Sequence, residues 1–206
     1  MKVLMINGSP RLKGNTAAAL AEMEKTFAAE GIEVETVQIG DKDVRGCIAC
    51  GTCGERGACV FDDVVNEIAP KFEQADGLVV ATPVYYASPN ATVIALLDRL
   101  FYSAKFDKTM KVGASIAVAR RAGTTATLDV VNKYFSFAGM PVAPSKYWNV
   151  AHGAKPGEVV QDEEGMQIMR NLGHNMAWIL KCIAAGKAAG IEPPKAENTI
   201  RTNFIR

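Results

Sequence analysis

The stretch Lys2-Val-Leu-Met-Ile-Asn-Gly-Ser-Pro-Arg-Leu-Lys-Gly-Asn-Thr16 decides how this chain is expected to fold. The continuous apolar run Val3–Ile6 predicts a strand buried on both faces, as in a parallel sheet. The run ends at Asn7-Gly8, and an Ala-rich helix is expected to begin at Ala17. A strand, a glycine turn and a helix N-terminus together direct free N–H groups and a positive dipole at one point. We therefore predict that this loop binds a phosphate.

The loop carries many hydrogen-bond donors but lacks the known nucleotide-binding spacings. The expected donors are Ser9, Arg11, Asn15 and Thr16. Five residues separate Gly8 from Gly14, and Asn15 stands where a P-loop requires lysine. The dinucleotide fingerprint is also missing, because Ser9-Pro10 replaces its second glycine. These features favour a terminal monophosphate. The alternative is an ordinary strand-to-helix turn that Asn15 or Thr16 caps.

Gly8-Ser-Pro-Arg11 with Gly14-Asn-Thr16 resembles the FMN-phosphate loop of the flavodoxin-like NAD(P)H-dependent FMN reductases. The rest of the chain alternates short apolar runs with segments of helix length, which is typical of a doubly wound α/β fold. Strands are expected at 32–39, 77–82, 112–118 and 142–150, and helices at 17–30, 64–74, 90–101, 125–138 and 165–189. We predict a five-stranded parallel sheet in the order 2-1-3-4-5, with helices on both faces and a Cys-rich insert, residues 41–63, after the second strand. In such a sheet the ligand lies at the carboxyl ends of strands one and three.

The loop after the third expected strand carries two adjacent tyrosines between prolines. Tyrosine offers a flat face for a flavin ring and a polar tip. Thr82-Pro-Val-Tyr85 resembles the isoalloxazine loop of the same reductases, which implies a ring site at Pro83, Val84, Tyr85 and Tyr86. The alternative is a turn whose tyrosines pack on a neighbouring helix.

The loop after the fourth expected strand contains Arg120, Arg121 and Gly123, and it also resembles the family's loop at that position. Cationic donors there suit a reduced flavin or a nicotinamide-cofactor phosphate. A solvated basic turn is the alternative. The neighbours Asp98 and Arg99 are interpreted as a structural ion pair.

The insert places Cys47, Cys50, Cys53 and Cys59 in a compact, glycine-rich segment. Short gaps let three thiolates converge on one metal centre, and a fourth completes the ligand set of an iron–sulfur cluster. The pattern resembles the iron–sulfur flavoproteins, a branch of the same superfamily, and implies a [4Fe–4S] cluster on these four cysteines. A zinc site and a redox-active thiol pair, such as Cys50 with Cys53, remain alternatives. Cys182 is expected to be buried in the core.

Length and composition limit the function classes. The 206 residues suit a single domain, 1–206, that ends in a polar tail, 190–206, with Asn198, Arg201 and Arg206. The net charge of +1 gives no general attraction to nucleic acid or to an anionic membrane. The absence of a signal-peptide pattern and of a long apolar run indicates a cytoplasmic protein.

These features together predict an FMN-dependent oxidoreductase. NAD(P)H is the expected electron donor, and the acceptor is a quinone, an azo or nitro compound, or a redox protein. The competing interpretation is an iron–sulfur flavoprotein that carries electrons from ferredoxin, and a third is a relative without cofactor that serves in regulation. Related reductases form homodimers or homotetramers, in which Tyr147-Trp148-Asn149 would cover the flavin of a neighbouring subunit.

Overall fold

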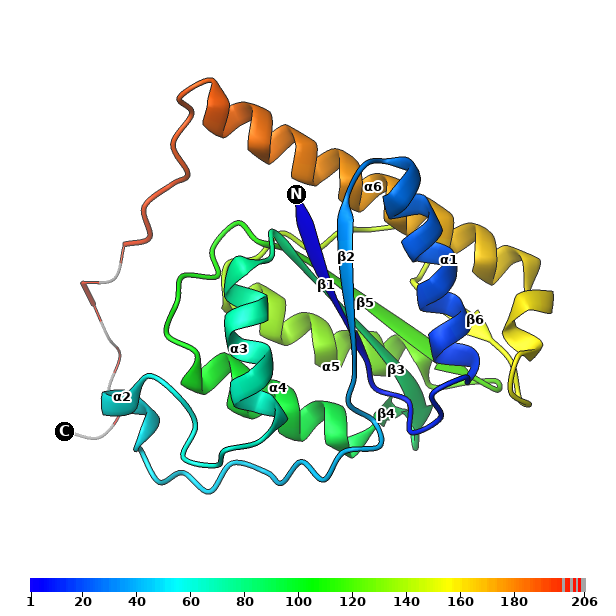
Figure 1. Ribbon diagram of the computed structural model, residues 1–206, viewed down its shortest axis with the longest axis horizontal. Coiled ribbons are helices and arrows are strands. Elements are labelled where there is room, and N and C mark those ends of the chain that lie inside the picture. The colour runs from blue at the N-terminus through cyan, green and yellow to red at the C-terminus, as the bar shows by residue number, and fades with distance from the viewer. Residues whose placement is uncertain (198, 201, 203, 205–206) are drawn as a thin grey trace.

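The computed structural model describes residues 1–197, 199–200, 202 and 204 (Figure 1). Its elements run in the order β1 (Lys2–Asn7), α1 (Asn15–Ala29), β2 (Glu33–Gln38), α2 (Cys53–Arg56), α3 (Val64–Gln74), β3 (Gly77–Tyr85), β4 (Ser88–Pro89), α4 (Ala91–Ser103), β5 (Val112–Ala119), α5 (Thr124–Phe137), β6 (Val150–His152), the 3₁₀ helix η1 (Glu158–Gln161) and α6 (Glu163–Ala188). Asn198, Arg201 and Arg206 of the predicted tail lie outside the described residues.

The sheet has the predicted doubly wound topology. Five parallel strands follow the order β2-β1-β3-β5-β6, and the short β4 pairs antiparallel with the end of β3. The strand order therefore reverses at β1, whose two neighbours are β2 and β3. The flavodoxin-like α/β prediction is confirmed. Because a ligand site is expected at such a switch point, the loops after β1 and β3 define the edge on which the site is built.

Two hydrophobic layers enclose the sheet, as the alternation within β1 requires. Val3 and Met5 face α1 and α6, whereas Leu4 and Ile6 face α3, α4 and α5. Figure 1 shows α1 beside the long α6 on one side of the sheet. All four of these β1 residues have no exposed surface, so β1 is buried on both faces as its continuous apolar run predicted.

The fifth strand differs from the prediction of 142–150. Only Val150–His152 forms a strand, while Val142 makes an isolated parallel bridge with Gly113. Pro144 has no N–H to donate to a ladder, so pairing stops there and the chain loops outward before β6. This loop exposes Tyr147 and Trp148, at 64% and 58% of their surface.

Cys182 lies exposed on α6, which corrects the prediction that it is a core residue. The inward positions of this helix are held by Met169, Leu172 and Met176 instead. Among the described residues no helix is both long and apolar enough to cross a membrane.

Candidate functional site

The loop after β1 leaves the start of α1 without a protein cap. The Ser9 N–H donates to Asn7 Oδ1 (3.0 Å), and the Arg11 N–H donates to Ser9 Oγ (3.2 Å), so the turn is tied to itself. Gly14 precedes α1 and offers no capping side chain. The first amide of the helix to find a backbone partner is that of Ala18, which donates to Gly14 O (3.1 Å). The amides of residues 15–17 therefore point toward a prospective anion.

Side-chain hydrogen bonds from Asn90 and Gln38 hold the backbone of this loop in place. Asn90 Nδ2 donates to Gly8 O (2.9 Å), and Gln38 Nε2 donates to Ser9 O. A Cβ placed on Gly40 would lie 2.2 Å from the Ser9 carbonyl carbon. The chain leaving β2 thus passes directly against the Gly8–Ser9 peptide, and only glycine fits at this crossing.

The predicted donors of the loop have different environments. Ser9 and Thr16 are buried, and Arg11 extends from the surface. Asn15 is half-buried, and its Oδ1 accepts a hydrogen bond from the Val159 N–H (3.3 Å) at η1. Asn15 therefore already has a structural bond to the segment before α6, and it keeps its amide N–H₂ for a ligand.

The predicted ring loop is a tight β-hairpin between β3 and β4. Its two central residues, Tyr86 and Ala87, have φ values of 51° and 57°, a left-handed conformation that costs free energy for residues other than glycine. Tyr86 is fully exposed and Tyr85 is 47% exposed. A strained turn that holds an aromatic ring in solvent is characteristic of a binding surface, because packing gives no reason for it.

The loop after β5 lies against this hairpin. Gly123 has a φ of 90°, and a Cβ on it would lie 2.7 Å from the Ala87 Cα. Arg120 and Arg121 are exposed on the same loop. The structure thus brings the loops after β3 and β5 into contact, and the loop after β5 carries two exposed arginines.

The four cysteines of the insert line one common cavity of about 20 Å³. Cys53 and Cys59 are buried, whereas Cys47 and Cys50 are exposed. Hydrogen bonds from the Thr52 hydroxyl and backbone N–H lower the pKa of the Cys50 thiol, which favours a thiolate ligand. In the described part of the chain, no three Cys, His, Asp or Glu side chains converge closely enough to hold a metal ion as they stand. The donor set fits a four-thiolate centre, and binding requires the four thiols to move closer together.

Arg99 of α4 reaches into the same cavity and is 1% exposed. Its guanidinium pairs with the Asp63 carboxylate at 2.7 and 2.9 Å and donates two hydrogen bonds to Cys59 Sγ at 3.2 and 3.3 Å. The predicted Asp98–Arg99 pair is wrong. Asp98 instead accepts a hydrogen bond from the Tyr134 hydroxyl, because consecutive helix residues point in different directions.

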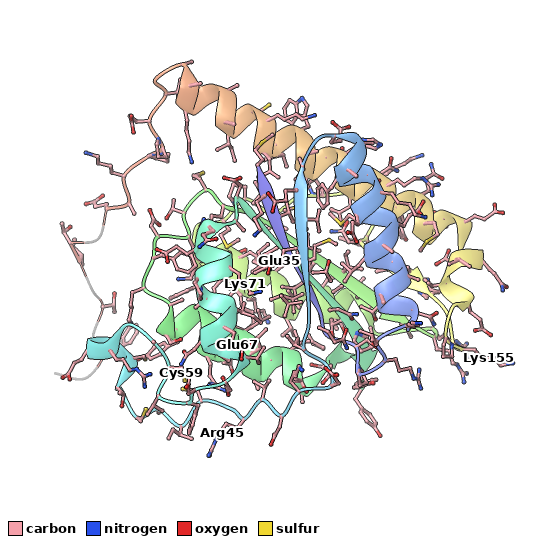
Figure 2. All side chains as sticks on the ribbon, in the orientation of Figure 1. Glu35, Arg45, Cys59, Glu67, Lys71 and Lys155 are labelled. Atoms are coloured by element: carbon pink, nitrogen blue, oxygen red, sulfur yellow. The ribbon has the colours of Figure 1, made fainter. Side chains whose placement is uncertain are left out.

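Asn66 of α3 holds the backbone of Cys59 from both sides. Its Oδ1 accepts from the Cys59 N–H, and its Nδ2 donates to the Cys59 carbonyl, both at 3.0 Å. Figure 2 shows Cys59 beside the lower end of α3, near Arg45. Sequence reasoning missed Asn66, Asp63 and Asn90. The only sequence signal was their position at helix starts, where such residues normally serve as caps.

Comparisons with known proteins give the family and the fold of this chain. The family model described as NADPH-dependent FMN reductase matches residues 1–155. An iron-sulfur flavoprotein of Methanocaldococcus jannaschii is 35% identical over 191 residues, which cover 89% of this chain and 99% of that protein. An iron-sulfur flavoprotein of Methanosarcina thermophila is 32% identical, and the match covers 89% of this chain and 97% of that protein. A flavodoxin structure from the domain Archaea shares the fold, with a TM-score of 0.59 at 15% identity, over 88% of this chain and 99% of its own.

The chain belongs to the NADPH-dependent FMN reductase family, within the group of iron-sulfur flavoproteins. It is accordingly an NAD(P)H-dependent FMN oxidoreductase, as the sequence predicted. The uncapped start of α1 and the close crossing at Gly40 fit a phosphate-bearing cofactor.

Proposed function

We propose that this chain binds FMN across the loops after β1, β3 and β5, and passes electrons from NAD(P)H to an acceptor. The observation that carries the proposal is the uncapped N-terminus of α1, which faces the loop at the point where the strand order reverses. The acceptor is a quinone, an azo or nitro compound, or a redox protein.

The protein's own groups bind and orient the cofactor. The first amides of α1, together with Ser9, Arg11, Asn15 and Thr16, hold the phosphate, since backbone N–H groups and a cation suit a dianion. The hairpin at Pro83–Tyr86 carries the ring, and Arg120 and Arg121 supply positive charge beside it. FMN held by these residues would supply the redox chemistry that links a hydride from NAD(P)H to the electrons given to the acceptor.

We further propose that Cys47, Cys50, Cys53 and Cys59 hold a [4Fe–4S] cluster, which transfers single electrons. The shared cavity of the four thiols supports this assignment. Asn90 caps α4 at the flavin edge, and Arg99 lines the thiol cavity further along the same helix. At 1.5 Å rise per residue, the two points lie about 14 Å apart along the helix. The predicted homodimer or homotetramer is supported by the exposed Tyr147 and Trp148.

Anaerobic purification tests both cofactors together. The expected result is a yellow-brown protein with flavin and iron–sulfur absorbance, one FMN per chain, and iron and sulfide in about equal amounts. NADPH added without oxygen should bleach the flavin band within seconds. A colourless protein that takes up no FMN would contradict the proposal, and zinc in place of iron would contradict the cluster.

The electron carrier is the second candidate, and the thiol cavity favours it because one-electron partners need a one-electron centre. In this case reduced ferredoxin, and not NADPH, would bleach the flavin of the same preparation. The two donors are compared at equal concentrations under identical anaerobic conditions.

A further inference from the structure

We propose that Arg99 and Asp63 are positioning residues that fix Cys59 as the preformed ligand of the thiol centre. The other three cysteines close onto this ligand when the centre is assembled. The inference rests on the proposed metal site. It adds two residues that do not touch the metal and assigns the four cysteines unequal roles.

The hydrogen bonds of Arg99 account for all five of its N–H donors. The Nε–H and one Nη2–H donate to Cys59 Sγ. One Nη1–H and the other Nη2–H donate to the Asp63 carboxylate, and the second Nη1–H donates to the Arg45 carbonyl oxygen (3.2 Å). A guanidinium is a rigid planar fork, so these bonds fix the sulfur in both distance and direction. The side chain is buried, and water does not compete for its donors.

The two halves of the insert differ in how firmly the fold holds them. The Cys59 backbone is bound on both sides by Asn66, and its sulfur is bound by Arg99. Cys47 and Cys50 are exposed and flank Ala49, a non-glycine residue with a φ of 53°. The Cys47–Cys53 segment is therefore the part that rearranges on metal binding, while Cys59 stays in place.

The same contacts have an electrostatic consequence. A four-thiolate centre is negatively charged, and a buried guanidinium that donates two N–H···S hydrogen bonds offsets this charge. Hydrogen bonds to the sulfurs raise the reduction potential of an iron–sulfur centre, because they stabilise its more negative reduced form. Arg99 thus contributes to both the affinity for the metal and the potential.

Arg99→Lys tests the role directly, because lysine keeps the charge but its three donors cannot bridge Cys59, Asp63 and the Arg45 carbonyl together. Arg56→Lys, at an exposed arginine of the same insert, is the matched control. The probe is Co²⁺, titrated into the reduced, FMN-loaded, metal-free protein and followed by cobalt–thiolate absorbance. We expect an affinity about 10–100-fold weaker in the Arg99 variant and unchanged in the Arg56 variant. In protein reconstituted with iron and sulfide, the midpoint potential should be more negative in the Arg99 variant.

The FMN content of each variant reports whether the sheet domain is folded. If Arg99→Lys does not fold, Asp63→Asn takes its place, with Asp62→Asn as control, and the same weakening is expected. Equal Co²⁺ affinity and equal potential in the variants and the wild type would overturn the inference. So would wild-type protein that binds Co²⁺ no better than Cys59→Ser. A third outcome separates the inference from the proposed cluster. If the wild type takes up no iron or sulfide, the cluster is refuted; if Arg99→Lys still binds Co²⁺ more weakly than the wild type, the inference is supported.

Discussion

At the scale of single residues, the ion pair between the buried Arg99 and the half-buried Asp63 joins the cysteine insert to α4. A buried guanidinium stays charged whether or not it is paired, so removing its partner leaves an uncompensated charge. Asp63 also caps α3 by accepting a hydrogen bond from the Val65 N–H. The ion pair and the cap can be separated experimentally, because asparagine caps a helix as well as aspartate does.

Asp63→Asn should therefore lower the free energy of unfolding by about 3 kcal/mol, through loss of the ion pair alone. Asp62→Asn, at the exposed neighbour, should change it by less than about 0.5 kcal/mol. Urea unfolding of the two variants in parallel measures the difference. Equal stability of the two variants would show that Asp63 does not stabilise Arg99.

The close approach of Gly40 to the phosphate loop leads to a second prediction, on FMN affinity. Gly40→Ala places a methyl group 2.2 Å from the Ser9 carbonyl carbon and must displace the phosphate loop. We expect FMN to bind about tenfold more weakly, a loss of about 1.4 kcal/mol. Gly46→Ala is the control, because its Cβ meets no atom within 4 Å. Fluorescence titration gives both affinities, and an unchanged value for Gly40→Ala would place the phosphate elsewhere.

Several residues of the candidate site could be proposed from the sequence because their chemistry shows in local spacing. The cysteines and the Ser9–Thr16 donors belong to this group. The partners of Arg99 could not be predicted, because Asp63 lies 36 residues away and nothing in the sequence links an aspartate to a distant partner. The adjacent Asp98 was the misleading choice, and helix geometry excludes it.

At the scale of elements, the β3–β4 hairpin stores strain at the position that presents Tyr86. Two-residue turns of this kind favour Asn and Gly, which tolerate a positive φ. Tyrosine at the tip of this turn therefore lowers the free energy of unfolding relative to asparagine or glycine at the same position.

Tyr86→Asn should raise the free energy of unfolding by about 1 kcal/mol, because asparagine adopts this conformation at lower cost. The same change should weaken FMN binding, since the aromatic face is lost. Calorimetry of the FMN-free protein and a flavin titration measure the two effects. Tyr102→Asn, at an exposed tyrosine of α4, is the control. A variant that binds FMN normally would remove Tyr86 from the ring site.

The contact between α1 and α6 includes a charged pair. Glu22 accepts hydrogen bonds from Arg170 (2.6 Å) and Lys25 (3.0 Å), and the bond from Arg170 is the main reason that its pKa lies below the usual value. A carboxylate with a depressed pKa stabilises the fold above its unfolded pKa, near 4.3. The contribution is lost as the pH falls through the lower folded value.

Glu22→Gln should therefore cost stability at pH 7, by less than about 1 kcal/mol because the pair is partly exposed, and cost nothing near pH 2. Glu24→Gln, an exposed carboxylate of the same helix, serves as control. Urea unfolding at both pH values checks the sign. A cost that persists unchanged at low pH would show that the side chain acts through packing.

The order and type of the five parallel strands and the five long helices followed from the hydrophobic periods, because a two-sided buried strand and an amphipathic helix differ in sequence. The short elements α2, β4 and η1 were not predicted. The fifth strand was misjudged for a physical reason. Its apolar residues, Val142 and Val150, lie in two separate short pairings with β5, and Pro144 interrupts the ladder between them.

At the scale of the whole molecule, one edge of the sheet gathers the loops proposed to bind FMN. The insert also leaves the sheet at this edge, after β2, and runs beneath α3 and α4 to α2 (Figure 1). The two proposed redox centres are therefore linked by α4, whose start meets the phosphate loop and whose later turns line the thiol cavity. The predicted strand order gave this edge of the sheet. The path of the 23-residue insert (41–63) could not be predicted, because its apolar residues follow no helix or strand period.

The most direct test of the account is the affinity of the purified chain for FMN after Ser9, Arg11 and Thr16 are replaced together by alanine, measured by flavin fluorescence. The account predicts a loss of at least about 100-fold, about 2.7 kcal/mol, with the protein still folded by circular dichroism. An unchanged affinity in the folded triple variant would contradict it, because the phosphate would then not lie at the start of α1.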